Sequence, residues 1–330
     1  EETIEHIRQH HHNPHYLLSV YFDTSLLSLS NSLPYVIDES EVLVIAIPSA
    51  YLVNILETLD PAVFSGKKVI SAVKGVLPGH NVLLNEYLQD KCGLHPRDYF
   101  TIMGPCHAEE VAAEKLSYLT FSGADAAATR AMAAAFKTRY LHTIINPDVQ
   151  GVQYAAVLKN IYALGAGIAH GLEYGDNFLS VFIANCAREM TGFLQEAAGA
   201  PAAPSFSSTP SSQATSPGAP AVSGAASPDA PAVSGAASPG MSGYFASVYL
   251  GDLLVTSYSL YSRNRTFGNM IGKGYSVQAA QLEMNMVAEG QNACRGIYEI
   301  NKHVGASMPI AETIYRILWE KLSAREGFKR

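Results

Sequence analysis

The chain contains little cysteine: only Cys92, Cys106, Cys186 and Cys294 occur in 330 residues, and no two of them form a Cys-x-x-Cys pair. This wide, irregular spacing argues against a disulfide framework and favours a reducing compartment. The chain also shows no signal peptide at its start. We therefore expect a cytoplasmic protein.

The chain also has fewer positively charged than negatively charged residues. The chain has 22 Lys and Arg against 29 Asp and Glu, which gives a net charge of −7. A general nucleic-acid binder usually presents a basic face, so we expect no nucleic-acid partner. The stretch 151–172 is long enough to span a bilayer, but Gln153, Lys159, Asn160 and several glycines make it a poor candidate, and we expect no stable membrane insertion.

Charge is almost absent from residues 197–243, where Asp229 is the single charged residue and Ala, Pro, Ser and Gly dominate. The decapeptide APAVSGAASP occurs there twice, at 219–228 and 230–239. Such a composition buries too little apolar surface to offset its chain entropy. It predicts a disordered insert between two helices.

The remaining sequence divides into two patterns. Short apolar runs at 42–47, 68–73, 99–103 and 117–123 alternate with helical patterns at 49–59, 81–92 and 126–140. This alternation is typical of a parallel sheet covered by helices on both faces. From about residue 147 the pattern is helical only. The sequence thus predicts a nucleotide-type α/β domain over 1–146, followed by an all-helical domain over 147–330.

Lys159 is the one formal charge in the apolar stretch 151–172. A lysine is almost never fully buried without a partner, and burial lowers its pKa. The side chain therefore either reaches solvent along the helix surface or works as an acid/base group.

Charged and small residues also follow the predicted strands. Lys74 comes just after one strand, and GPCHAEE (104–110) follows another and enters a helix. Ligands of open α/β sheets gather outside the carboxyl ends of strands. Together with the Ser-Arg-Asn-Arg run at 262–265, whose guanidinium groups suit phosphate, these segments predict one anion-binding site. Three consecutive histidines within HHHNPHY (10–16) point in different directions on a helix, so we expect no metal site there.

Several motifs in fixed order carry a resemblance to a known family: IPSAYL, VISAVKGVLP, GPCHAEEVA, LKNIYALGAGIAHGLEYGDN and GDLLVTSYSLYSRNRTFG. Together they resemble the bacterial NAD(P)-dependent glycerol-3-phosphate dehydrogenases over about residues 4–320. The resemblance implies a partial dinucleotide-binding Rossmann domain over 1–146, a helical substrate-binding domain over 147–330, and NAD or NADP as cofactor. It implies reversible hydride transfer at C2 of glycerol 3-phosphate or dihydroxyacetone phosphate, a phosphorylated small-molecule substrate, for phospholipid synthesis. It is also compatible with a homodimer.

The resemblance implies roles for individual residues. Lys159 matches the general acid/base, Lys74 a lysine near cofactor and substrate, and Asp252 an acid of the substrate site; these three are the implied catalytic residues. The implied substrate contacts are these three together with Gly104, Cys106, Ser262, Arg263 and Asn264. The implied cofactor contacts are Lys74, Ala108, Arg263, Val287 and Glu289.

The sequence departs from the family pattern in two places. Cys106 stands where the family usually has serine, and a thiol is a weak donor. The family also has a strand, a glycine-rich loop and a helix before the counterpart of residue 4, and no G-x-G-x-x-G occurs here. We therefore expect a sheet without its central strand and with two unpaired strand edges. Residues 1–330 alone should bind NAD(H) or NADP(H) very weakly and show no measurable dehydrogenase activity. Two alternatives stay open: a truncated inactive homologue, and a related hydroxyacid or ketopantoate-type reductase.

Overall fold

The computed structural model describes residues 1–199, 243, 246–284 and 287–329. The predicted insert at 197–243 lies largely outside these residues. Its first residues, 197–199, are the end of a long helix, α8 (Gly175–Gly199), and Ala197 packs against the apolar core.

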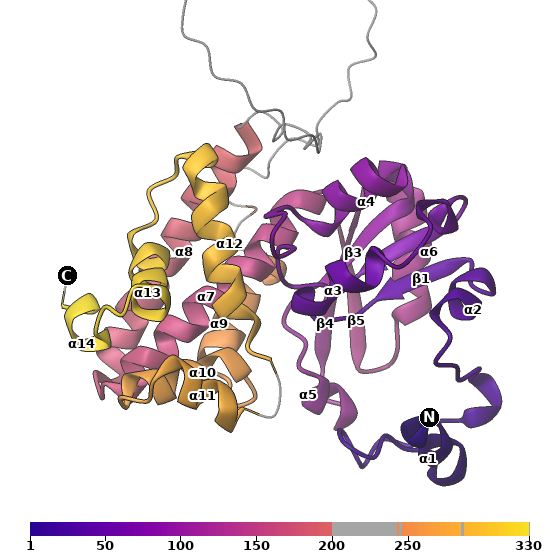
Figure 1. Cartoon of the computed structure of the whole chain (residues 1–330), viewed down its shortest axis with the longest axis horizontal. Coiled ribbons are helices and arrows are strands. Elements are labelled where there is room, and N and C mark those ends of the chain that lie inside the picture. Colours follow the sequence, from indigo (N-terminus) through magenta and orange to yellow (C-terminus); the bar gives the residue numbers. More distant parts are fainter. Residues whose placement is uncertain (200–242, 244–245, 285–286, 330) are drawn as a thin grey trace, which may run out of the picture.

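The first part of the chain forms one five-stranded sheet with the strands in sequence order (Figure 1). Its strands are β1 (Val42–Ile45), β2 (Lys68–Ser71), β3 (Tyr99–Met103), β4 (Ser117–Gly123) and β5 (Leu141–Asn146). The pairs β1–β2, β2–β3 and β4–β5 are parallel, whereas β3 and β4 are antiparallel. The predicted α/β fold is confirmed, but the sheet is mixed rather than fully parallel.

The reversal at β4 has a simple physical reason. A parallel neighbour requires a crossover that returns the chain to the opposite edge of the sheet. The connection after β3 holds only the short helix α5 (Ala108–Ala112), so β4 starts near the edge where β3 ends and runs back. The sequence patterns also missed β5, whose burial pattern is only partial.

Helices cover both faces of the sheet. Val69 of β2 packs with Leu52 of α3 (Ser49–Leu56) and Leu88 of α4 (Leu84–Cys92). Ile70, the next residue of β2, belongs to a second cluster with Phe136 of α6 (Ala126–Phe136). Successive side chains of a strand point to opposite faces, so these two clusters are the two layers of the core.

The five strands are hydrogen-bonded without a break, so the expected gap in the middle of the sheet is not seen. β1 and β5 are its edges. Val44 of β1 is half-exposed, and the helices α1 (Glu2–His10) and α2 (Leu33–Asp38) precede this edge in the chain (Figure 1).

The second part of the chain contains no strand among its described residues. Its long helices α7 (Val149–Gly171) and α8 are followed by a π-helical turn at Ser247–Gly251. The remaining helices are α9 (Asp252–Tyr258), α10 (Arg263–Gly272), α11 (Val277–Glu283), α12 (Glu289–Val304), α13 (Pro309–Trp319) and α14 (Ala324–Gly327). All pack around one large apolar cluster with α7 at its centre (Figure 1). In the described part of the chain, no helix combines the length and the apolar character needed to cross a bilayer.

Candidate functional site

Helix α7 is buried on all sides along most of its length. Asp148 caps its first turn by accepting a hydrogen bond from the backbone N–H of Gly151 at 2.7 Å. Every residue from 152 to 169 is buried, as is typical of a helix at the centre of a domain. Lys159 lies in the middle of this stretch and is only 4% exposed, so its side chain does not reach solvent.

Glycines allow α10 to approach α7 at backbone distance. A Cβ atom on Gly268 would lie 2.0 Å from the carbonyl oxygen of Leu164, and one on Gly167 would lie 2.1 Å from that of Arg265. Only glycine permits such an approach without displacing a helix. This close packing brings the start of α10 next to the middle of α7.

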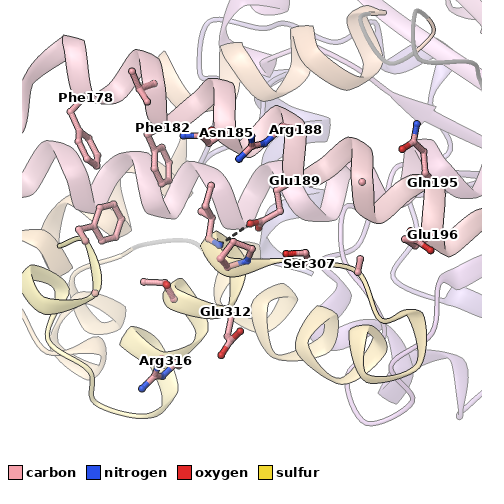
Figure 2. A pocket seen from close by; sticks show the side chains of 18 residues that line it. Phe178, Phe182, Asn185, Arg188, Glu189, Gln195, Glu196, Ser307, Glu312 and Arg316 are labelled. Atoms are coloured by element: carbon pink, nitrogen blue, oxygen red, sulfur yellow. Dashed lines mark hydrogen bonds between the residues drawn. The ribbon is translucent and has the colours of Figure 1, made fainter. Parts of the chain in front are cut away.

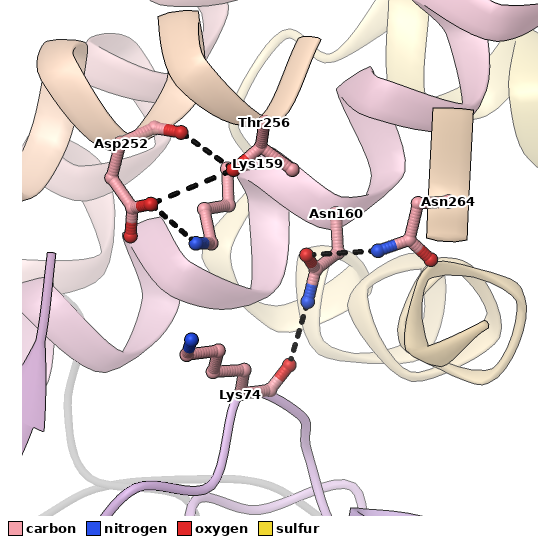
Figure 3. Close-up of polar contacts among 6 residues, drawn as sticks. All are labelled: Lys74, Lys159, Asn160, Asp252, Thr256 and Asn264. Atoms are coloured by element: carbon pink, nitrogen blue, oxygen red, sulfur yellow. Dashed lines mark hydrogen bonds and ion pairs between the residues drawn. The ribbon is translucent and has the colours of Figure 1, made fainter. Parts of the chain in front are cut away.

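Lys159 forms a buried ion pair with Asp252, the first residue of α9 (Figure 3). Its Nζ lies 2.5 Å from Oδ1 of Asp252, which is itself 1% exposed. Thr256, one turn on, donates its hydroxyl to the Asp252 carbonyl at 2.7 Å. Oδ2 of Asp252 is buried and has no hydrogen-bond partner among the described residues, so an acceptor remains in the site.

The surroundings lower the pKa of Lys159 to about 8. Burial is the main cause because it disfavours the charged ammonium, and the positive charge of Lys74 acts in the same direction. Asp252 opposes both effects. The amine therefore changes its protonation state near neutral pH, as a proton-transferring group requires.

A chain of amide hydrogen bonds connects Lys74 to the helical domain (Figure 3). The carbonyl of Lys74, in the loop after β2, accepts a bond from Nδ2 of Asn160 at 3.1 Å. Oδ1 of Asn160 accepts from Nδ2 of Asn264 at 2.9 Å, and Oδ1 of Asn264 accepts from the N–H of Gly290 at 2.9 Å. The strand end, α7, α10 and α12 are thus held in one arrangement.

The segment after β3 lies beside the ion pair. Gly104 has a φ of 121°, a conformation that favours glycine, and a Cβ there would lie 3.1 Å from the Tyr118 carbonyl. Cys106 and His107 are both half-buried and within electrostatic reach of Lys74, Lys159 and Asp252.

These surroundings keep the two side chains of that segment uncharged near neutral pH. Burial raises the pKa of the Cys106 thiol, so it is not a poised nucleophile. Burial, and then the two lysines, lowers the pKa of His107, whose Nδ1 is buried without a partner among the described residues.

The Ser262–Asn264 run lies at the start of α10. Ser262 is the N-cap of α10, where its Oγ accepts from the N–H of Arg265 at 3.3 Å. Asn264 is buried and engaged in the amide chain. Arg263 alone of the three is exposed, and it forms no ion pair within the described part of the chain.

The predicted cofactor contacts lie further apart than the predicted substrate contacts. Glu289 accepts hydrogen bonds from the N–H of Ser49 at 2.9 Å and from its Oγ at 2.5 Å, so it links α12 to the start of α3. Val287 lines a neighbouring cleft of about 380 Å³ that also includes Tyr51. Ala108 is exposed at the start of α5.

A cleft of about 830 Å³ lies elsewhere, between α8 and α13 (Figure 2). It contains Glu189, a buried carboxylate that accepts bonds from the N–H groups of Ile310 and Ala311 at 2.8 and 2.9 Å. These bonds satisfy the free N–H groups at the start of α13, so Glu189 has a structural role. None of the predicted site residues lines this cleft.

No group of three or more His, Cys, Asp or Glu in the described ranges is arranged to hold a metal ion. The histidines of the first segment do lie near one another: the ring centroids of His6 and His10 are 4.4 Å apart, and those of His6 and His12 are 4.8 Å apart.

The fold and the site together define a class: a Rossmann-type domain followed by a helical domain that supplies a buried lysine is the arrangement of a two-domain nicotinamide-dependent dehydrogenase. The family model described as NAD-dependent glycerol-3-phosphate dehydrogenase N-terminus matches residues 1–129. The C-terminus model matches residues 148–211 and 234–329. The interruption at 212–233 falls within the segment that carries the repeated decapeptide.

Relatives match nearly the whole chain. The glycerol-3-phosphate dehydrogenase [NAD(P)+] of Listeria monocytogenes is 31% identical over 328 residues, 99% of this chain and 85% of the relative. That of Salinibacter ruber is 30% identical over 330 residues, with 100% and 85% covered. The chain belongs to the NAD-dependent glycerol-3-phosphate dehydrogenase family, and the resemblance seen in its motifs is confirmed.

Solved structures agree in fold. Glycerol-3-phosphate dehydrogenase from Coxiella burnetii superposes with a TM-score of 0.81 at 21% identity, covering 99% of this chain and 87% of the other. The enzyme from Saccharomyces cerevisiae gives 0.74 at 21% identity, covering 99% and 85%. At this sequence identity the structural similarity shows the fold, which is a sheet domain followed by a helical domain.

The structure thus brings together Lys159, Asp252, Lys74, Cys106 and Asn264, whereas Ala108 and Arg263 are exposed beside this group. Sequence reasoning passed over Asn160 and Ser49. The sequence did carry a signal for Asn160, because this polar residue lies in the same apolar helical stretch as Lys159. Ser49 had none, since its bonds to Glu289 join residues 240 positions apart.

Proposed function

We propose that this chain catalyses the reversible oxidation of glycerol 3-phosphate to dihydroxyacetone phosphate with NAD or NADP. The observation that carries the proposal is the buried Lys159–Asp252 pair, with the pKa of Lys159 at about 8, in a chain of this family. The product of the reduction serves phospholipid synthesis, and the enzyme works in the cytoplasm, as a homodimer.

Lys159 is the proton-transferring group. In the oxidation its neutral amine takes the proton of the C2 hydroxyl, and in the reduction its ammonium returns a proton to the C2 oxygen. Asp252 holds the amine in place at 2.5 Å and balances its charge when it is protonated. Lys74 lies near enough to lower the pKa of Lys159, and it polarises the C2 carbonyl of the ketone.

In this proposal the dinucleotide binds at the edge where β1, β2 and β3 end, because the three strands are parallel and their carboxyl ends meet there. Ser49, Lys74 and Gly104 follow those three strand ends. When bound, the nicotinamide supplies or accepts the hydride at C2. Ala108, Val287 and Glu289 are the further cofactor contacts in this proposal, with Ser49 fixing the carboxylate of Glu289.

Arg263 binds the phosphate group of the substrate. Ser262 and Asn264 already use their side chains within the protein, so they position the start of α10, while the exposed guanidinium remains available. At Gly104 and Cys106 the backbone provides the contact, because a thiol is a weak donor.

The test is a dehydrogenase assay with dihydroxyacetone phosphate and NADH or NADPH, run on residues 1–330 and on the same chain preceded by a strand, a glycine-rich loop and a helix. We expect no measurable turnover from residues 1–330 alone, because the dinucleotide binds weakly there, and turnover from the extended chain. The extended chain should turn over ketopantoate or pyruvate much less, because neither carries a phosphate. Lys159→Met should abolish turnover, whereas Lys137→Met, at an exposed lysine of the sheet domain, should not. Equal rates with ketopantoate would favour the related reductases, and no turnover with any ketone would favour an inactive homologue.

A further inference from the structure

A second cleft in the helical domain lies where the end of α10 and the start of α11 meet the loop between α13 and α14. Its volume is about 930 Å³, within the usual range for sites that hold small molecules. Lys159, Asp252, Lys74 and Arg263 do not line it. It is therefore distinct from the proposed catalytic site.

The charge of this cleft is opposite to that of the chain. Lys273, Lys321 and Arg325 line it, and none of the described residues that line it is acidic, although the chain carries a net charge of −7. None of the three cations forms an ion pair with another described residue.

The acidic residues nearby in sequence are already engaged. Glu320 pairs with Arg316 at 3.4 Å, and Glu326 accepts a hydrogen bond from the Ser323 hydroxyl at 2.7 Å. The three cations thus face the cleft with no acidic residue among its described lining, an arrangement that attracts an anion.

The cleft also has an aromatic wall. Trp319 and Tyr275 both line it, and Trp319 is 37% exposed. The indole is held in place from two directions: its N–H donates to the Gln291 carbonyl at 3.3 Å, and the Arg295 guanidinium lies 5.3 Å from the ring centroid. A fixed, partly exposed ring is a surface on which a flat base can stack.

We propose that this cleft binds a nucleoside polyphosphate. Lys273, Lys321 and Arg325 hold the phosphates, the base lies against Trp319, and the amides of Gln278 and Gln281, which also line the cleft, provide hydrogen bonds. This binding does not depend on the dehydrogenase reaction and would remain in a chain without turnover.

The chain offers a direct probe, because Trp319 is its only tryptophan. Titration with ATP should quench the tryptophan fluorescence in a saturable way. Inorganic pyrophosphate should compete with ATP, since it carries the charge without the base. Adenosine alone should bind at least about tenfold more weakly than ATP, because it lacks the charge-assisted hydrogen bonds.

Charge reversal tests the assignment. Lys273→Glu/Arg325→Glu should weaken ATP binding by at least about tenfold, since two attractive charges become repulsive. The matched control is Arg130→Glu/Lys137→Glu, which makes the same change of net charge on exposed residues of the sheet domain and should leave ATP binding unchanged. Circular dichroism verifies that both variants are folded.

Three results would overturn the proposal: no saturable quenching up to about 5 mM ATP, equal weakening in both double variants, or adenosine binding as tightly as ATP. Failure of pyrophosphate to compete would also overturn it, because the cations would then not read the phosphates. None of these outcomes bears on turnover with dihydroxyacetone phosphate.

Discussion

Replacing Lys159 by methionine tests the buried ion pair most directly. The substitution keeps the length of the side chain and removes the amine from a position that is 4% exposed. It therefore changes the proton-transferring group and the charge balance of the site with little change in volume.

The size of the electrostatic effect follows from the pKa of Lys159, which burial lowers from 10.5 to about 8. This lowering of the pKa means that the native state disfavours the ammonium by about 3 kcal/mol relative to the unfolded chain. The unfolded state binds more protons between about pH 8 and 10.5, so the free energy of unfolding should rise with pH across this window. In the methionine variant this rise should disappear.

Near neutral pH the stability of the single variant depends on Asp252. Its carboxylate would remain buried without its cation, and breaking a buried pair in this way costs about 3–5 kcal/mol. Lys159→Met/Asp252→Asn removes both charges and should recover most of that loss, because a buried pair replaced by neutral groups is often no less stable.

Thermal and urea unfolding, monitored by circular dichroism, give the stabilities, and the reduction of dihydroxyacetone phosphate by NADH gives the turnover. Both variants should lose about 10²–10⁴-fold in kcat, the usual contribution of general acid/base catalysis. The double variant shows that the loss does not come from unfolding. If either variant retained more than a tenth of kcat, Lys159 would not be the acid/base.

Three further outcomes are expected. The kcat/KM for glycerol 3-phosphate oxidation should rise with pH up to about 8, where the Lys159 amine becomes neutral, and the kcat/KM for ketone reduction should fall above that pH. Asp252→Asn should move the midpoints of both profiles to lower pH. A profile that is flat from about pH 6 to 10 contradicts the assignment. Arg263→Ala should raise KM for dihydroxyacetone phosphate about tenfold or more but have little effect with dihydroxyacetone; equal effects would show that Arg263 does not read the phosphate. Gly268→Ala should lower the melting temperature and kcat, because its Cβ would lie 2.0 Å from the Leu164 carbonyl. Gly192→Ala should leave both unchanged or raise the melting temperature, because a Cβ there would meet no described residue within 4 Å beyond its own helical turn. Similar behaviour of the two variants would refute the close packing of α7 and α10.

Much of the fold could be predicted from local patterns. The strands at 99–103 and 117–123 have the bounds found in the structure, because continuous apolar runs of that length suit a buried strand. The direction of β4 could not be predicted, because strand direction depends on the path of the connection between two strands and not on the hydrophobic pattern of either strand. β5 was missed for a related reason: its half-exposed residues do not form an apolar run.

The candidate site shows the same division. The sequence by itself determined that Lys159 is unusual, because one ammonium in an apolar stretch requires a partner or a function wherever that stretch folds. Only the tertiary structure decided that the partner is Asp252, 93 residues away, and that Asn160 and Asn264 connect Lys74 to α12. It also decided that Ser262 caps α10 while Arg263 stays exposed. Burial, distance and the lowered pKa of Lys159 arise from segments that are far apart in the chain, and folding alone brings these segments together.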